Sequence, residues 1–239
     1  MPPHEPPPIT EAQYWRDYEL IDNDIHAAIV CCYTHRAISH LVATDPEIYA
    51  RVNANPEFWQ ATAYSLQNML FILLSRILGH SSGVHTVHQL LNATIARQDL
   101  FTKDARRARV LAVPGGKWTP EALAEYDRNN TWEPTGANLR TLKTDLRPHT
   151  KKLEEIYSPI RDQVAHIILK DDTAIADLYT KTQKSDLDEI LQFLHGLVKA
   201  IRHMAYNGQP HDIKADNYGF RAKANRIMKE TEDMLRSLQ

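Results

Sequence analysis

The chain has 239 residues and a formal net charge of −2 at pH 7, which excludes a broadly basic protein that coats nucleic acid. A chain of this length is one large domain or two small ones and can bury a substantial apolar core. Its two cysteines, Cys31 and Cys32, are adjacent and cannot form an ordinary disulfide with each other, which fits a reducing interior.

The N-terminal segment is predicted to be a tail without a targeting role. Residues 1–9 are rich in proline and should be disordered. No basic region followed by an apolar stretch is present there, so no secretion signal is expected. The most apolar segment, residues 69–74, is far shorter than the roughly 20 residues that span a bilayer. We therefore expect a soluble cytoplasmic protein with no membrane partner.

Two long helices are predicted next. Thr10 and Gln13 have the spacing of a capping box, and apolar residues at helical spacing continue from there to Thr44. Pro56 begins the second helix, because proline suits the first helical position. This second helix is apolar on nearly all sides, so we expect it to be the central and most buried one.

Residues of about 80–135 are predicted to form a helical excursion. A short helix follows the apolar residues from Val84 to Ile95, and Thr119 followed by Pro120 has the pattern of a helix start. Beyond the excursion, the leucines of residues 139–146 resume a helical pattern, with Pro148 as a kink or restart.

The remaining chain is also predicted to be helical. Pro159 follows Ser158 in a helix-start pattern, Ser185 opens the last strong apolar helix, and Gly208 ends it. No segment shows the sustained alternation of a strand. We therefore predict an all-α antiparallel helical bundle. Its domain spans residues 10–210, and a charged C-terminal helix follows within residues 211–239.

The hexapeptide from Arg161 to His166 is the main candidate for chemistry. RNA cleavage without a metal needs a proton shuttle and a cation that stabilises the extra charge of the phosphorane, and His166 and Arg161 supply such groups. On a helix, these two side chains and Asp162 face away from the apolar side. Arg161 and His166 then lie roughly 140° apart around the helix axis. They would flank a groove, which a substrate phosphate or a second subunit would fill. The alternative is a solvated polar helix face bearing an Arg-Asp pair and a histidine without a role.

This hexapeptide, Arg-Asp-Gln-Val-Ala-His, follows Pro159-Ile160 and resembles the signature of the HEPN superfamily. The signature is Arg, a polar residue, three to five further residues and His. The chain is most similar to the AbiU2-like branch, which is linked to abortive infection against phages. The apolar helix ending in residues 71–78 and the segment 82–91 also resemble that branch, and the similarity covers roughly residues 10–206.

The resemblance implies an antiparallel bundle that forms a homodimer and brings two motifs into one cleft. It also implies a metal-independent endoribonuclease that cleaves single-stranded RNA, without a cofactor, in phage defence or a toxin-antitoxin-like stress system. By resemblance, His166 would be the general acid/base, Arg161 would hold the scissile phosphate, and Asp162 would orient one of them. The products would be a cyclic phosphate and a 5′-hydroxyl, and an antitoxin or defence protein is an implied partner.

The sequence leaves a second function open. Relatives that work with a nucleotidyltransferase often carry a tyrosine two residues after the histidine. This chain has Ile168 at that position, so nucleotidylation is not expected there. The residues after the motif, including Lys170, are less basic than an RNA groove prefers. The alternative is a non-catalytic HEPN-like module that binds a partner protein or a nucleotide through the same face.

Other residues are weaker candidates. Arg106, Arg107 and Arg109 form the densest basic run, which together with Lys170 is a candidate RNA contact; the alternative for the run is a solvated helix face. His85 and His88 lack accompanying Cys or carboxylate ligands, so no metal site is expected there. Arg76 ends an apolar helix, and we expect it to be buried and paired with a carboxylate.

Overall fold

The computed structural model describes residues 9–79, 85–157, 183–210, 212–213 and 218–238. Every secondary-structure element in that part of the chain is helical, which confirms the predicted all-α class. The elements are α1 (Glu11–Thr44), α2 (Pro46–Asn53), α3 (Pro56–Leu78), α4 (Val87–Ala96), η1 (Gln98–Phe101), α5 (Lys103–Leu111), α6 (Pro120–Asn130), α7 (Gly136–Lys152), η2 (Leu153–Tyr157), α10 (Lys184–Asn207) and α11 (Phe220–Ser237).

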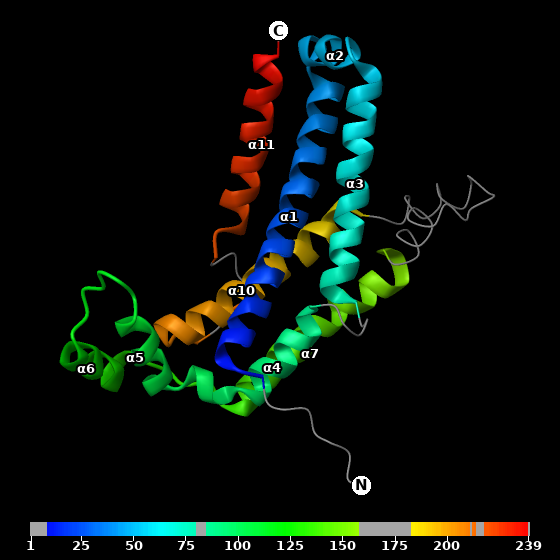
Figure 1. Cartoon of the computed structure of the whole chain (residues 1–239). Helices are drawn as coiled ribbons and strands as arrows, with labels where there is room; N and C mark the ends of the chain where they lie inside the picture. The colour runs from blue at the N-terminus through cyan, green and yellow to red at the C-terminus, as the bar shows by residue number, and fades with distance from the viewer. Residues whose placement is uncertain (1–8, 80–84, 158–182, 211, 214–217, 239) are drawn as a thin grey trace.

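Helix α1 is the long axis of the molecule, and α3 and α11 run beside it (Figure 1). It begins where predicted, because Thr10 and Gln13 form the capping box. It ends at Asp45, whose side chain accepts hydrogen bonds from the Glu47 and Ile48 amides and so caps α2. The short α2 was not predicted, and it turns the chain so that α3 returns along α1.

The main core lies where α10 crosses α1 near the lower end of the molecule in Figure 1. Leucine, isoleucine and valine side chains of α10 are fully buried there, and α4 and α7 contribute further leucines. Tyr18 of α1 donates a hydrogen bond to the carbonyl oxygen of Val198 at 2.9 Å, which satisfies its hydroxyl inside the apolar core. Helix α10 ends at Gly208, whose positive φ of 58° matches the predicted glycine stop.

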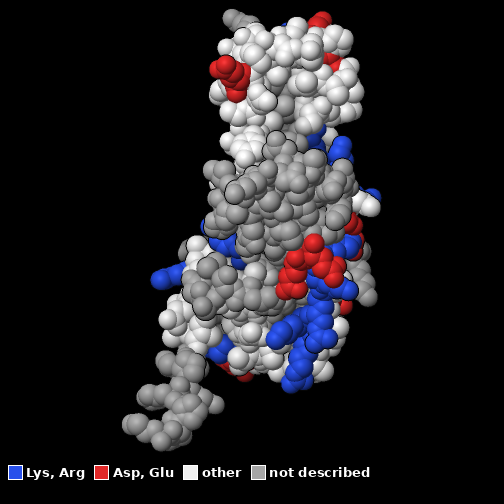
Figure 2. Space-filling model, turned by 90° about the vertical axis from the view of Figure 1, so that its right-hand side faces the viewer, with Lys and Arg blue, Asp and Glu red and all other residues white. Residues whose placement is uncertain are grey.

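Helix α3 is not the most buried helix, so that prediction was wrong. Phe58 is 62% exposed and Met69 is 47% exposed, whereas the core-facing side chains of α10 are buried along its whole length. Among the described elements, α1 makes most of the contacts with α3, while α2 packs against Trp59 at the upper end and α4 and η2 pack against the lower end. The upper end of the face drawn in Figure 2 is accordingly largely uncharged, and Lys and Arg gather near its lower end.

Two further expectations concern single residues. Arg76 forms the predicted ion pair, with Asp24 of α1, but almost half of its side chain is exposed and the pair is not buried. Pro148 lies inside α7, and that helix continues to Lys152 without restarting. A proline removes one backbone donor, which weakens the ladder of hydrogen bonds at one position but does not have to end it.

Within the described part of the predicted excursion, α5 and α6 are the helices that project from the body of the molecule (Figure 1). Helix α4 and η1 belong to the main core, since Leu90, Leu91, Leu100 and Phe101 are buried in it. Helix α11 packs along α1 through Phe220, Ala224 and Ile227 and lies within the predicted C-terminal segment.

Candidate functional site

The candidate catalytic residues Arg161, Asp162 and His166 lie outside the described residues, as does Lys170. The predicted homodimeric motif cleft lies outside them as well. The candidate RNA contacts Arg106, Arg107 and Arg109 are described.

Arg106 and Arg107 are held by one buried carboxylate. Arg106 is 5% exposed, and its guanidinium pairs with Asp127 of α6 and donates to the Tyr206 carbonyl oxygen at 3.0 Å. Arg107 binds the other oxygen of Asp127 through Nε at 2.8 Å. A buried arginine is stable only when its charge is paired and its donors are satisfied. These contacts favour a structural role, in which both arginines fasten α5 to α6 and α10.

Arg109 joins α5 to the body of the molecule. Its Nη1 lies 2.9 Å from Glu11 Oε1, and its Nη2 donates to the Ala205 carbonyl oxygen at 2.9 Å. The guanidinium also lies 5.6 Å from the ring centres of Trp15 and Tyr206. The guanidinium of Arg109 is therefore already held by hydrogen bonds and by two aromatic rings. These contacts favour a role in anchoring α5 over a role in binding RNA.

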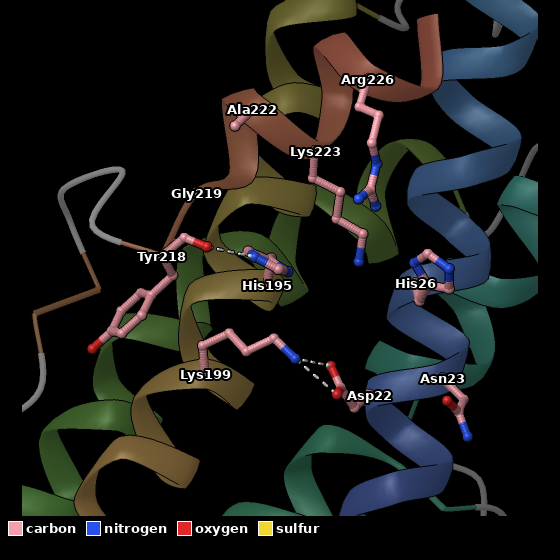
Figure 3. A pocket seen from close by; sticks show the side chains of 10 residues that line it. All are labelled: Asp22, Asn23, His26, His195, Lys199, Tyr218, Gly219, Ala222, Lys223 and Arg226. Carbon is pink, nitrogen blue, oxygen red and sulfur yellow. Dashed lines mark hydrogen bonds and ion pairs between the residues drawn. The ribbon is translucent and has the colours of Figure 1, made fainter. Parts of the chain in front are cut away.

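A polar cleft lies elsewhere, between α1, α10 and α11, and has a volume of about 620 Å³ (Figure 3). Lys199 extends into it from α10, and Lys223 and Arg226 extend into it from α11. The carboxylate of Asp22, on α1, is the acidic group on its wall. Among the described residues, three cations thus face one anion around this space.

Helical spacing brings these side chains together. Asp22 and His26 are one turn apart on α1, as are His195 and Lys199 on α10, so each helix presents a pair on its cleft side. Gly219 has a φ of 72°, a left-handed conformation that glycine adopts without strain, and it begins α11. No side chain of the described residues caps this start and no acidic residue lies in the first turn, so the partial positive charge of the α11 N-terminus stays uncompensated by its own helix.

The charges in the cleft are only partly neutralised. The ammonium of Lys199 binds both carboxylate oxygens of Asp22, at 3.1 and 2.9 Å. Lys223 makes no ion pair within the described part of the chain, and the carboxylate nearest to Arg226 is that of Glu230, at 3.7 Å on its own exposed helix face. Burial lowers the pKa of Lys223, and the charge of Lys199 lowers it further. An unpaired excess of positive charge therefore remains around Lys223.

His195 is the most buried polar residue of the cleft, at 4% exposure. Its Nε2 lies 3.1 Å from the carbonyl oxygen of Tyr218, whose phenol ring points away from the cleft (Figure 3). Burial lowers the pKa of His195, so the imidazole is neutral at pH 7. His26 lies opposite on α1, where partial burial and then Lys223 lower its pKa. Both histidines are therefore uncharged hydrogen-bonding groups rather than additional cations.

The chemistry of the cleft is that of binding. Its cations, neutral imidazoles and single carboxylate suit an anionic ligand with polar substituents. Among the described residues no group of three His, Cys, Asp or Glu is arranged to hold a metal ion. His85 and His88 are engaged separately, with Asp17 at 3.0 Å and with Thr150 at 3.2 Å.

Sequence reasoning missed this cleft. In the sequence, the cleft is marked only by polar residues about one helical turn apart in three segments, near residues 22, 195 and 223. Each segment alone looks like an ordinary solvated helix face. Only the packing of α11 against α1 and α10 brings them together.

Comparisons with known proteins do not assign this chain to a family. No family model matches it, and no curated protein or solved structure does so either. None of the described helices is both long enough and apolar enough to cross a membrane.

Proposed function

We propose that the protein binds a phosphate-bearing ligand in the cleft between α1, α10 and α11, with Lys223 and Arg226 as the anchoring cations. The observation that carries this proposal is the unpaired positive charge of Lys223 in a half-buried position. A charged lysine beside two other cations is costly, and a bound anion relieves both the repulsion and the loss of solvent.

Two features favour phosphate over a single carboxylate. Gly219 and Ala222, at the start of α11, line the cleft, so the partial positive charge of this helix N-terminus lies at its wall, an arrangement that favours anions with several oxygens. The volume of about 620 Å³ lies within the range of roughly 300 to 1,000 Å³ typical of small-ligand sites and holds more than one bare ion. A solvated basic face is the competing explanation, and binding experiments separate the two.

The test is titration calorimetry with inorganic pyrophosphate at low ionic strength. Lys223→Met and Arg226→Met should each weaken binding by about 10- to 100-fold, because each removes a charge-assisted hydrogen bond worth roughly 1.5–3 kcal/mol. Lys229→Met is the matched control, since Lys229 lies on the same helix but pairs with Asp233 at 2.9 Å outside the cleft. Equal losses in all three variants, or no binding by the wild type, would refute the proposal.

The ribonuclease hypothesis remains a second proposal, and the hexapeptide of residues 161–166 carries it. It includes the HEPN-type antiparallel bundle, the homodimer, the antitoxin or defence partner, and the cytoplasmic location. It predicts that Arg161→Ala and His166→Ala abolish RNA cleavage without unfolding the protein. If the wild-type protein leaves RNA intact, the ribonuclease hypothesis is refuted and the alternative, a non-catalytic binding module, is favoured. Pyrophosphate binding at Lys223 is independent of that outcome.

A further inference from the structure

His195 has a fixed tautomer. A carbonyl oxygen only accepts hydrogen bonds, so the contact of 3.1 Å with Tyr218 requires that Nε2 carries the proton. Nδ1 of the neutral ring is then a bare lone pair. The ring is also restrained by Phe220, whose centre lies 6.0 Å away. His195 is therefore a fixed acceptor on the wall of the cleft.

This acceptor has no partner in the described part of the chain. Nδ1 of His195 is shielded from solvent and makes no hydrogen bond. The ammonium of Lys199, one turn along α10, is occupied by both oxygens of Asp22. A buried acceptor without a donor costs free energy, and most such groups in proteins are satisfied. His195 lines the cleft, so a donor bound there is the nearest candidate for the missing partner, and a small shift of the neighbouring side chains would open the shielded Nδ1 to it.

We infer that the cleft selects a phosphate ester that also carries hydroxyl groups, with the phosphate at Lys223 and Arg226 and one hydroxyl donating to Nδ1 of His195. This inference rests on the proposed function and names its ligand class. Asp22 is a second acceptor for such a ligand, because an ionised carboxylate has about four lone-pair positions and Lys199 takes two of them. A sugar phosphate combines these groups in one small molecule.

The test compares ribose 5-phosphate with pentyl phosphate, which has the same chain length and phosphate but no hydroxyl groups. The wild type should bind ribose 5-phosphate on the order of tenfold more tightly, the effect of one satisfied buried acceptor. Adenosine 5′-monophosphate is a third arm, and affinity beyond that for ribose 5-phosphate identifies a nucleotide rather than a free sugar phosphate as the source of the group.

Two substitutions of His195 separate its nitrogens. His195→Gln places an amide near the position of Nε2, so it keeps a donor for Tyr218 and removes the acceptor at Nδ1. His195→Asn places its amide near Nδ1 and gives up the bond to Tyr218. The preference for ribose 5-phosphate should fall to within about twofold of unity in His195→Gln and persist in His195→Asn. Equal preference in wild type and His195→Gln would overturn the inference.

A measurement on the unmodified protein covers the case in which a variant does not fold. The ¹⁵N resonance of Nδ1 should move toward the hydrogen-bonded range on addition of ribose 5-phosphate and stay in place with pentyl phosphate. If both phosphates bind equally to the wild type, this inference fails while the proposed function stands. If neither binds and Lys223→Met changes nothing, the proposed function itself fails.

Discussion

Asp127→Asn tests whether the basic run of α5 is structural. Asp127 is fully buried and accepts from Arg106, from Arg107 Nε at 2.8 Å and from Thr131 Oγ1 at 2.6 Å. The substitution keeps the shape of the side chain and removes its charge. Its amide then faces two guanidinium groups, and that of Arg106 lies in a buried position.

The expected loss in the free energy of unfolding is about 3–5 kcal/mol, the cost of leaving a buried charge without its partner. Local unfolding of α5 and α6 would cap that loss, because the pair fastens a projecting part of the fold. Urea unfolding followed by circular dichroism measures the global change, and amide hydrogen exchange shows whether α5 and α6 open first.

Asp104→Asn is the control for Asp127→Asn. Asp104 also pairs with Arg107, at 2.9 Å, but its side chain is 91% exposed, so solvent screens the interaction and stability should change little. If Asp127→Asn costs less than about 1 kcal/mol, or no more than the control, the arginines are not structural. Contact of Arg106, Arg107 and Arg109 with RNA would then again be the better explanation of the basic run.

Two further predictions concern charge and pH. Asp22→Asn removes the carboxylate that the described residues place in the cleft and frees Lys199, so pyrophosphate should bind more tightly, and weaker binding in calorimetry would contradict this assignment of charges. Burial lowers the pKa of His149 below its ordinary value of 6.5, so the unfolded chain takes up a proton at higher pH than the folded one. Stability should therefore fall as pH drops below about 6.5, and His149→Gln should flatten this slope in thermal melts. A slope as steep in His149→Gln as in the wild type would contradict this role of the histidine.

Local chemistry predicted the helix ends, and long-range packing determined the rest. Thr10, Pro56 and Gly208 mark boundaries through their own hydrogen bonds and backbone angles, so the sequence identified them. The α2 start at Asp45 and Pro46 carried a similar signal that was not recognised. The burial of α3 was overestimated because its apolar composition shows that the helix can be buried, but not how many other elements pack against it.

The candidate sites show the same division. The basic run at residues 106–109 looked like a surface because its partner carboxylate, Asp127, lies on another helix. The cleft draws on segments separated by more than 170 positions along the chain, as the contact between Asp22 and Lys199 shows. No local spacing predicts such a contact, since it depends on how α11 and α10 pack against α1.

The pKa of Lys223, measured by NMR of its ammonium group with and without pyrophosphate, tests the central claim most directly. Burial and Lys199 lower this pKa in the free protein, and a bound anion favours the charged lysine. The account predicts that saturating pyrophosphate raises the pKa of Lys223 to its ordinary value of 10.5 or above, while Lys229 does not respond. A Lys223 pKa that stays unchanged under saturating pyrophosphate would contradict the assignment of this cleft as the phosphate site.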